Sequence, residues 1–320
     1  MAHEIETAAF AKPTWHKQGH YWAEGEAPTT IEAAMADAQC NWRVLEKPIF
    51  MQGADTDDST ITGDVDGWKA LVRETDGKVL HVARDTYAVA QNLPTFTAFQ
   101  QLVDDGACSI DGVASLRGGK VLFLNLDCKI SGSLDSDGDA IKGNLLIVNS
   151  HDGSLPVMIM FSAIRVVCAN TLAMALSAHR QSAIKIRHRG DPVAAVQDTI
   201  RFIDASRRTF ALSMDDWRDM KTTHITIDGL RQYARMTLQP DIKVEDTDPR
   251  AVDSVIEAYR TAPGSGIAGT TVWGAYNAMT HWLDHTRGHS DDSRAYASTF
   301  GSGQPIRRRA HDNAMALCAD

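Results

Sequence analysis

Residues 143–167 read GNLLIVNSHDGSLPVMIMFSAIRVV, and this stretch decides the fold. Two apolar and β-branched runs, 143–150 and 155–167, flank the tetrapeptide His151-Asp152-Gly153-Ser154. Glycine accepts the positive φ that tight hairpin turns require. The stretch therefore predicts an antiparallel hairpin in the middle of the chain.

The segments before this hairpin have the same character. Alternating or β-branched runs occupy 78–92 and 109–130, and the second is interrupted by hairpin turn chemistry at Arg117-Gly118-Gly119-Lys120. Two acidic segments, 53–67 and 133–143, are predicted as loops. The first half of the chain is thus expected to form a meander of antiparallel strands.

Beyond Ala169 the pattern becomes helical. NTLAMALSAHR (170–180) predicts a helix with Asn170 as its N-cap and the cation Arg180 near its C-terminus, where it complements the helix dipole. IKIRHRG (184–190) is a short basic strand or extended link. Further helices are expected over 191–212, 214–221, 226–238, 249–261, 270–287 and 305–317.

These elements predict an α+β fold: an antiparallel β-meander in the N-terminal half with a β-β-β-α core, and a helical C-terminal half. Residues 1–190 are expected to form a mostly antiparallel sheet domain with a covering helix. Residues 191–320 are then a helical region packed on it, and the two parts could also be one continuous domain.

Composition limits the setting of the protein. The 320 residues are 43% hydrophobic, enough for a substantial core, but no run of about 18 apolar residues occurs and the first residues lack an apolar secretion signal. The five cysteines are odd in number and never form a C-x-x-C pair, which argues against a disulfide framework and a structural zinc. We expect a cytoplasmic protein without membrane contact.

Charge is distributed unevenly along the chain. The net charge is -9, and residues 1–164 hold 12 Lys and Arg against 23 Asp and Glu. Residues 165–208 hold 8 against 3, and the remainder holds 12 against 15. One basic segment therefore lies within an acidic protein.

The basic segment is the first candidate site. In a strand over 184–190, Lys185, Arg187 and Arg189 share one face and His188 lies on the other. A row of cations suits a polymer of phosphates, and arginine offers a bidentate fork. The alternative is a solvated edge strand whose cations prevent edge pairing. The proposed nucleic-acid contacts from this region are Arg165, Arg180, Lys185, Arg187, His188 and Arg189.

The second candidate is TVWGAYNAMTHWLDHTRGH (271–289). Trp273 and Tyr276 offer flat faces on which bases can stack. In an alternative interpretation His281, Asp284 and His285 hold a divalent metal for a hydrolase or nuclease, with His151 or Asp152 adding a ligand. Trp282 follows His281, so the H-E-x-x-H glutamate of metalloproteases is missing. A hydrogen-bonded cluster at a helix packing interface explains the same residues.

Cys168 is the third candidate, since a thiol at a helix N-terminus is favoured as thiolate. A nucleophile would need a base, which His188 or His151 could supply. No nucleophile motif surrounds Cys168, and free cysteines are usually buried, so a core role is expected. No residue is assigned as catalytic.

Several motifs together resemble a known family. MAHEIE with PTWHKQG (13–19), then SLRGGK, NSHDGS, IRVVCANTL, IRHRG and TVWGAYNAMTHWLDH resemble, in this order, a phage/plasmid-like family. It is the family of unknown function numbered nine-three-two, found in actinobacterial phages and plasmids. This resemblance implies a mobile-element protein and a bacterial host cytoplasm, and it directs attention to DNA transactions.

The predicted topology also bears comparison. The predicted order of three antiparallel strands, a helix and a basic link is similar to the core of single-strand annealing proteins of the Rad-fifty-two type. Those proteins form rings that hold one DNA strand along an electropositive groove. We therefore expect a non-enzymatic phage protein that binds single-stranded DNA without a cofactor. It is further expected to be a homo-oligomer that acts in strand annealing and recombination. The alternatives are the metal-dependent hydrolase and an anti-defence protein whose acidic N-terminal half imitates DNA.

Overall fold

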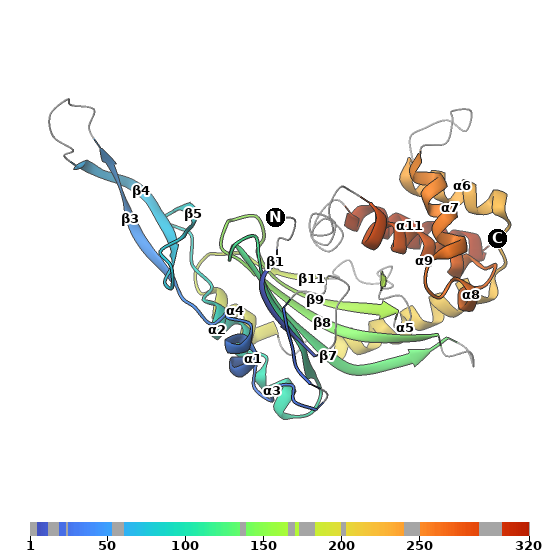
Figure 1. The fold of residues 1–320 in the computed structure, drawn as a ribbon, viewed down its shortest axis with the longest axis horizontal. Helices are drawn as coiled ribbons and strands as arrows, with labels where there is room; N and C mark the ends of the chain where they lie inside the picture. Colours follow the sequence, from blue (N-terminus) through green and yellow to red (C-terminus); the bar gives the residue numbers. More distant parts are fainter. Residues whose placement is uncertain are drawn as a thin grey trace.

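The structure is a computed structural model of the 320-residue chain. It describes residues 5–11, 19–23, 25–52, 61–134, 139–165, 170–172, 183–199, 203–239, 250–287 and 303–319. Antiparallel sheets form the N-terminal half and helices form the C-terminal half, which confirms the α+β prediction (Figure 1). Among the described residues no helix has the length and apolar content needed to cross a bilayer.

The large sheet is a meander of eight strands in the order β10-β9-β8-β7-β6-β1-β2, with β11 also pairing β9. All its described pairs are antiparallel except β1 with β2. The bounds are β1 Ile5–Phe10, β2 His20–Tyr21, β6 Ser109–Leu116, β7 Val121–Ser133, β8 Ala140–Ser150, β9 Val157–Arg165, β10 Asn170–Leu172 and β11 Ala183–Ile186.

The central hairpin forms as the sequence predicts. β8 and β9 pair in a register that places Ile147 opposite Ile159, and Gly153 in the connecting turn has a φ of 72°. The turn between β6 and β7 also has positive φ, at Arg117, Gly118 and Gly119. Turn chemistry and apolar patterning therefore agree along these four connected strands.

The helix predicted over 170–180 is wrong at its start. Asn170–Leu172 form strand β10, and Asn170 pairs with Arg165 of β9 instead of capping a helix. Pairing with the outer edge of β9 satisfies backbone groups that a cap would have satisfied only in part. Residues 173–180, the rest of the helix predicted to cover the β-β-β-α core, lie outside the described residues.

A second sheet replaces much of the predicted acidic loop. β3 Val44–Gln52, β4 Ile61–Arg73 and β5 Val79–Arg84 form an antiparallel sheet in the order β3-β4-β5. β4 includes residues 61–67 of the segment expected to be a loop, because they pair across to β3 despite their aspartates and glycines. The long β3 and β4 extend away from the large sheet as an arm (Figure 1).

The first core lies between one face of the large sheet and four short helices. These are α1 Ile31–Asp37, α2 Asn92–Thr97, α3 Gln100–Asp104 and α4 Pro192–Thr199. Leu122 and Leu124 of β7 pack there with Ile31 and Phe96 of the helices. Thr30 caps α1 by accepting a hydrogen bond from Ala33 N. α4 follows the predicted boundary at residue 190 and packs on this core through Val196.

The second core is helical and meets the sheet at the far ends of β8 and β9. Ile141 and Ala163 of those strands pack against Trp217, Tyr233 and Trp273. Most predicted helices are confirmed, although 214–221 merges into one longer helix. The helices are α5 Ile203–Thr222, α6 Ile227–Leu238, α7 Arg250–Thr261, α8 Ser265–Ala268, α9 Val272–His281 and α11 Gly303–Ala319, and the π-turn η2 Trp282–Thr286 follows α9.

Asp139 joins the sheet to the helices. It is completely buried just before β8, and its carboxylate accepts a hydrogen bond from Trp273 Nε1 at 2.8 Å. Lys221 Nζ of α5 lies 3.9 Å from the same oxygen atom. An acidic residue that the sequence places in a loop is therefore a buried anchor for α5 and α9.

Replacing Asp139 with alanine should lower the free energy of unfolding by about 3 kcal/mol, because the Trp273 indole N–H loses its buried acceptor and Lys221 loses a buried ion-pair partner. Asp139→Asn retains an acceptor and should cost about half as much. Urea unfolding followed by tryptophan fluorescence measures both. Asp215→Ala, which removes an exposed partner of Arg218, is the control and should change stability by less than about 0.5 kcal/mol. Equal effects of Asp139→Ala and Asp215→Ala would contradict the anchoring role.

Candidate nucleic-acid interface

A cleft of about 350 Å³ opens beside the small sheet, where β5 meets the turn after β11. Its lining combines aromatic rings with cationic side chains. The lining residues are Trp68, His81, Val82, Ala83, Arg84, Thr86, Tyr87, His188 and Arg189. None of these nine residues is acidic, so the lining itself favours an anionic or aromatic ligand.

One wall of the cleft comes from the register of β4 and β5. Trp68 lies directly opposite Arg84, and the Arg84 guanidinium lies 4.1 Å from the centre of the indole ring. This distance is well within cation–π range. Sequence reasoning missed both residues, since their proximity depends on pairing between two strands. The signal that could have found them is the aromatic residue Trp68 and the cation Arg84 in neighbouring strand-forming runs.

A second wall of the cleft joins Tyr87 to the basic segment. The rings of Tyr87 and His188 are stacked, with centres 4.7 Å apart and planes 13° apart. Tyr87 donates its hydroxyl hydrogen to Ser150 O at 3.0 Å, and Ala88 N donates to His188 O at 3.0 Å. These bonds fix the turn after β11 against the segment that follows β5. Burial raises the pKa of Tyr87, so it remains a neutral donor.

The basic segment shows the alternation that the sequence predicts. Lys185, Arg187 and Arg189 are exposed, whereas Ile184 and Ile186 pack against the first core. β11 pairs with Val157–Met160 at the outer edge of β9. Within the described parts of the chain, no ion pair joins these three cations to a carboxylate. The row of cations therefore faces solvent and continues into the cleft at Arg189.

Other predicted phosphate contacts do not join this row. His188 is only 7% exposed, and its Nδ1 lies 3.2 Å from Ala88 O, so the prediction that it binds phosphate is wrong in this structure. Burial lowers the pKa of His188, which further disfavours a cationic role. Arg165 is the last residue of β9, and nothing is described of its side chain. Arg180 lies outside the described residues.

The predicted stacking residues are also corrected. Trp273 and Tyr276 are both 0% exposed and lie in the second core, where their rings pack 6.0 Å apart. They cannot receive a base without unfolding of α9. The helix is buried along most of its length because α5, α7 and α11 surround it, a context that its aromatic pattern alone does not reveal.

The histidine cluster resembles a packing interface more than a metal site. The rings of His281 and His285 lie 4.6 Å apart, but Asp284 is ion-paired with the buried Arg307 of α11. Burial, and then the charge of His285, lower the pKa of His281 to about 4. In the described ranges no group of three or more His, Cys, Asp or Glu side chains is arranged to hold a metal ion. The divalent-metal interpretation gains no support from these contacts.

The remaining candidates also have structural explanations. Cys168 lies outside the described residues. His151, suggested as its base or as a metal ligand, is completely buried, and Asn92 Oδ1 lies 2.7 Å from His151 Nε2. The amide nitrogen of Asn92 donates to Trp42 O, so its oxygen accepts and His151 Nε2 carries the hydrogen. His151 Nδ1 is buried, and it has no hydrogen-bond partner among the described residues.

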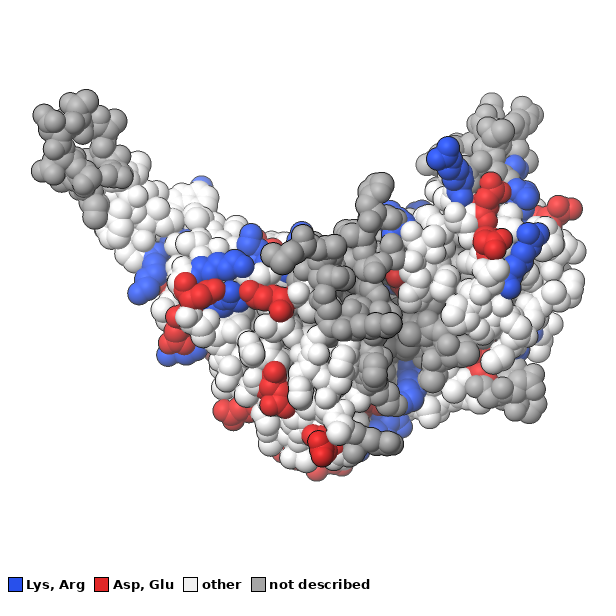
Figure 2. Space-filling model, in the orientation of Figure 1, with Lys and Arg blue, Asp and Glu red and all other residues white. Residues whose placement is uncertain are grey.

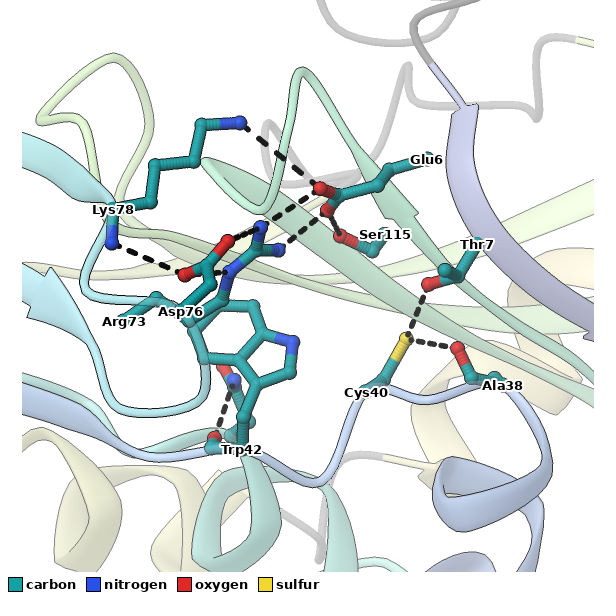
Figure 3. A network of polar contacts seen from close by, with 10 residues as sticks. Glu6, Thr7, Ala38, Cys40, Trp42, Arg73, Asp76, Lys78 and Ser115 are labelled. Atoms are coloured by element: carbon teal, nitrogen blue, oxygen red, sulfur yellow. Dashed lines mark hydrogen bonds and ion pairs between the residues drawn. The ribbon is translucent and has the colours of Figure 1, made fainter.

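A network of charges holds the base of the arm (Figure 3). Arg73 of β4 donates from Nη1 and Nη2 to the Glu6 carboxylate of β1, at 2.7 and 2.9 Å. Its Nε donates to Asp76 at 2.9 Å, and Ser115 Oγ donates to Glu6 at 3.1 Å. Burial opposes ionisation of Glu6, but these contacts lower its pKa overall. The bidentate pair ties the small sheet, and with it Trp68, to the large sheet.

The fold and cleft define an α+β protein with a long antiparallel meander and a basic, aromatic cleft between two sheets. A family model described as "Domain of unknown function (DUF932)" matches residues 79–316, so the chain belongs to this family. This confirms the resemblance seen in the sequence motifs. No curated protein and no solved structure matches the chain.

The burial of His151 predicts a pH dependence of stability. Burial, and then the charge of His188, lower the pKa of His151 to about 3. An unfolded histidine titrates near about 6.5, so the unfolded state binds the extra proton between about pH 6.5 and 3. The stabilisation from neutral His151 is therefore present above about pH 6.5. It is lost as the pH falls, by at most about 1.4 kcal/mol per pH unit.

His151→Gln, which can still donate to Asn92, should unfold with a shallower loss of stability between about pH 6.5 and 4 than the native chain. Urea unfolding at successive pH values gives the two slopes. His224→Gln is the matched control, because His224 is exposed and should leave the native slope unchanged. Identical slopes for His151→Gln and the native protein would contradict the assigned burial of a neutral imidazole.

Proposed function

We propose that this protein binds single-stranded nucleic acid along Lys185, Arg187 and Arg189 and in the adjoining cleft. The observation that carries the proposal is that Arg189, the last cation of the basic segment, shares one cleft with Arg84, Trp68 and Tyr87. Cations spaced along a strand meet successive phosphates, while aromatic rings accept bases. A binding surface that combines the two is typical of proteins that hold single strands.

The local charge at Lys185, Arg187 and Arg189 favours nucleic-acid binding, although the chain as a whole is acidic. The net charge of -9 opposes nucleic-acid binding in general, so a nucleic-acid surface must be local. Lys185, Arg187 and Arg189 are exposed and stand in a segment with an excess of positive charge. Figure 2 shows Lys and Arg interspersed with Asp and Glu on the described part of the visible face.

Strand annealing by a homo-oligomer is the finer form of the proposal. It is supported by the resemblance of the sequence motifs to a mobile-element family. Annealing also requires no catalytic groups, and no residue of this chain is assigned as catalytic. Binding to single strands is the part that the cleft and the cations support directly. It is therefore the part to be measured first.

The test is fluorescence anisotropy of labelled oligothymidylate and oligouridylate over a range of salt concentrations. Affinity should fall as salt rises, because each neutralised phosphate releases counterions. Arg187→Ala and Arg189→Ala should each weaken binding and reduce the slope of log affinity against log salt by about 0.7. Use of both polymers shows whether DNA or RNA is preferred.

Arg218→Ala is the matched control, since Arg218 is an exposed arginine on α5 that is paired with Asp215. It should leave affinity and slope unchanged. Absence of binding to either polymer at low salt overturns the proposal. Binding that Arg218→Ala weakens as much as Arg187→Ala would show a diffuse attraction and would overturn the assigned site.

A further inference from the structure

The cleft has the dimensions of a site for one small planar group. Its volume of about 350 Å³ is near the lower end of the range of ligand pockets, roughly 300–1,000 Å³. The lining residues come from three short stretches: Trp68, the segment from His81 to Tyr87, and the turn at His188 and Arg189. A duplex cannot enter such a space, because its bases remain stacked on one another.

The two aromatic walls are held in place before any ligand arrives. Tyr87 is fixed by its stack on His188 and its bond to Ser150 O. Trp68 is restrained by the Arg84 guanidinium, which lies 4.1 Å from the centre of its ring. Restraining these side chains in advance lowers the entropy that a ligand must remove on binding.

The surface of the cleft is mainly apolar, which suits the flat face of a base, and cationic side chains are among its lining residues. Arg84 and Arg189 are both exposed and belong to the lining of the cleft. His81 is half-buried there, and Thr86 adds an exposed hydroxyl group. Phosphate oxygens accept from guanidinium groups, and base edges accept from or donate to imidazole and hydroxyl groups.

From these contacts we infer that the cleft receives a single unpaired base of the bound strand, with the adjoining phosphates on Arg84 and Arg189. This inference rests on the proposed function, and it specifies that the cleft binds one base of the single strand. The strand then continues along Arg187 and Lys185, whose side chains follow the same exposed row. It does not continue along the distal arm, where Asp64 and Asp66 are exposed and would repel phosphates.

Three probes of equal length distinguish base insertion from binding of the backbone alone: oligothymidylate, the same backbone with abasic residues, and a duplex. The native protein should bind the abasic strand about tenfold or more weakly than oligothymidylate, since stacking is lost while the phosphates remain. The duplex should bind no better than the abasic strand. Each affinity is measured by anisotropy at the same low salt concentration.

Thr86→Trp is the decisive variant, because it fills the cleft from an exposed position and removes no hydrogen bond of the described residues. It should reduce affinity for oligothymidylate to that of the abasic strand and leave affinity for the abasic strand unchanged. Gln232→Trp adds the same ring at an exposed position on α6 and should have neither effect. Circular dichroism checks that both variants are folded as the native chain.

The outcomes separate the two proposals. If oligothymidylate and the abasic strand bind equally well, or if Thr86→Trp leaves oligothymidylate affinity unchanged, base insertion is overturned while single-strand binding stands. If no strand binds, both are overturned. Trp68→Phe, which retains an aromatic face, should preserve most of the preference for bases, whereas Trp68→Leu should lose it.

Discussion

The hydrogen bond from Trp273 Nε1 to the Asp139 carboxylate is the constraint on which the arrangement of the molecule depends. Asp139 lies just before β8, and Trp273 lies in the first turn of α9, the helix around which the second core packs. An unpaired buried carboxylate is strongly destabilising, so this hydrogen bond favours packing of the helical half against the sheet at this point. Lys221 reinforces it from α5.

The two cores meet along the same strands. Ile130 and Phe161 pack against both, so β7 and β9 are continuous supports rather than links between independent parts. This continuity also positions the cleft. The small sheet is tied to the large sheet by Glu6 and Arg73, and the turn after β11 is tied to the segment after β5 by Ala88 and His188. Both walls are thus held in place by contacts with neighbouring segments of the chain.

Local patterns in the sequence were reliable where local physics decides the structure. The β8–β9 hairpin, the α6 and α7 helices and the alternation of Ile184, Lys185 and Ile186 follow from periodicity and turn chemistry. Asn170 was misjudged because pairing with the edge of β9, the strand that ends just before it at Arg165, competes with helix capping. The burial of Trp273 and Tyr276 depends on neighbouring helices, and the Trp68–Arg84 pair depends on register, so neither is visible in a single segment.

The division of the cores along the chain has a consequence for synthesis on the ribosome. Every buried member of the first core lies between Ala9 and Val196, whereas the second core needs residues as late as Ala314. The N-terminal half can therefore collapse while the later helices are still inside the exit tunnel. Until α9 emerges, the Asp139 carboxylate would remain solvated, because Trp273 is not yet present to donate to it. Its charge would keep that end of the nascent sheet hydrated and less prone to misassociation.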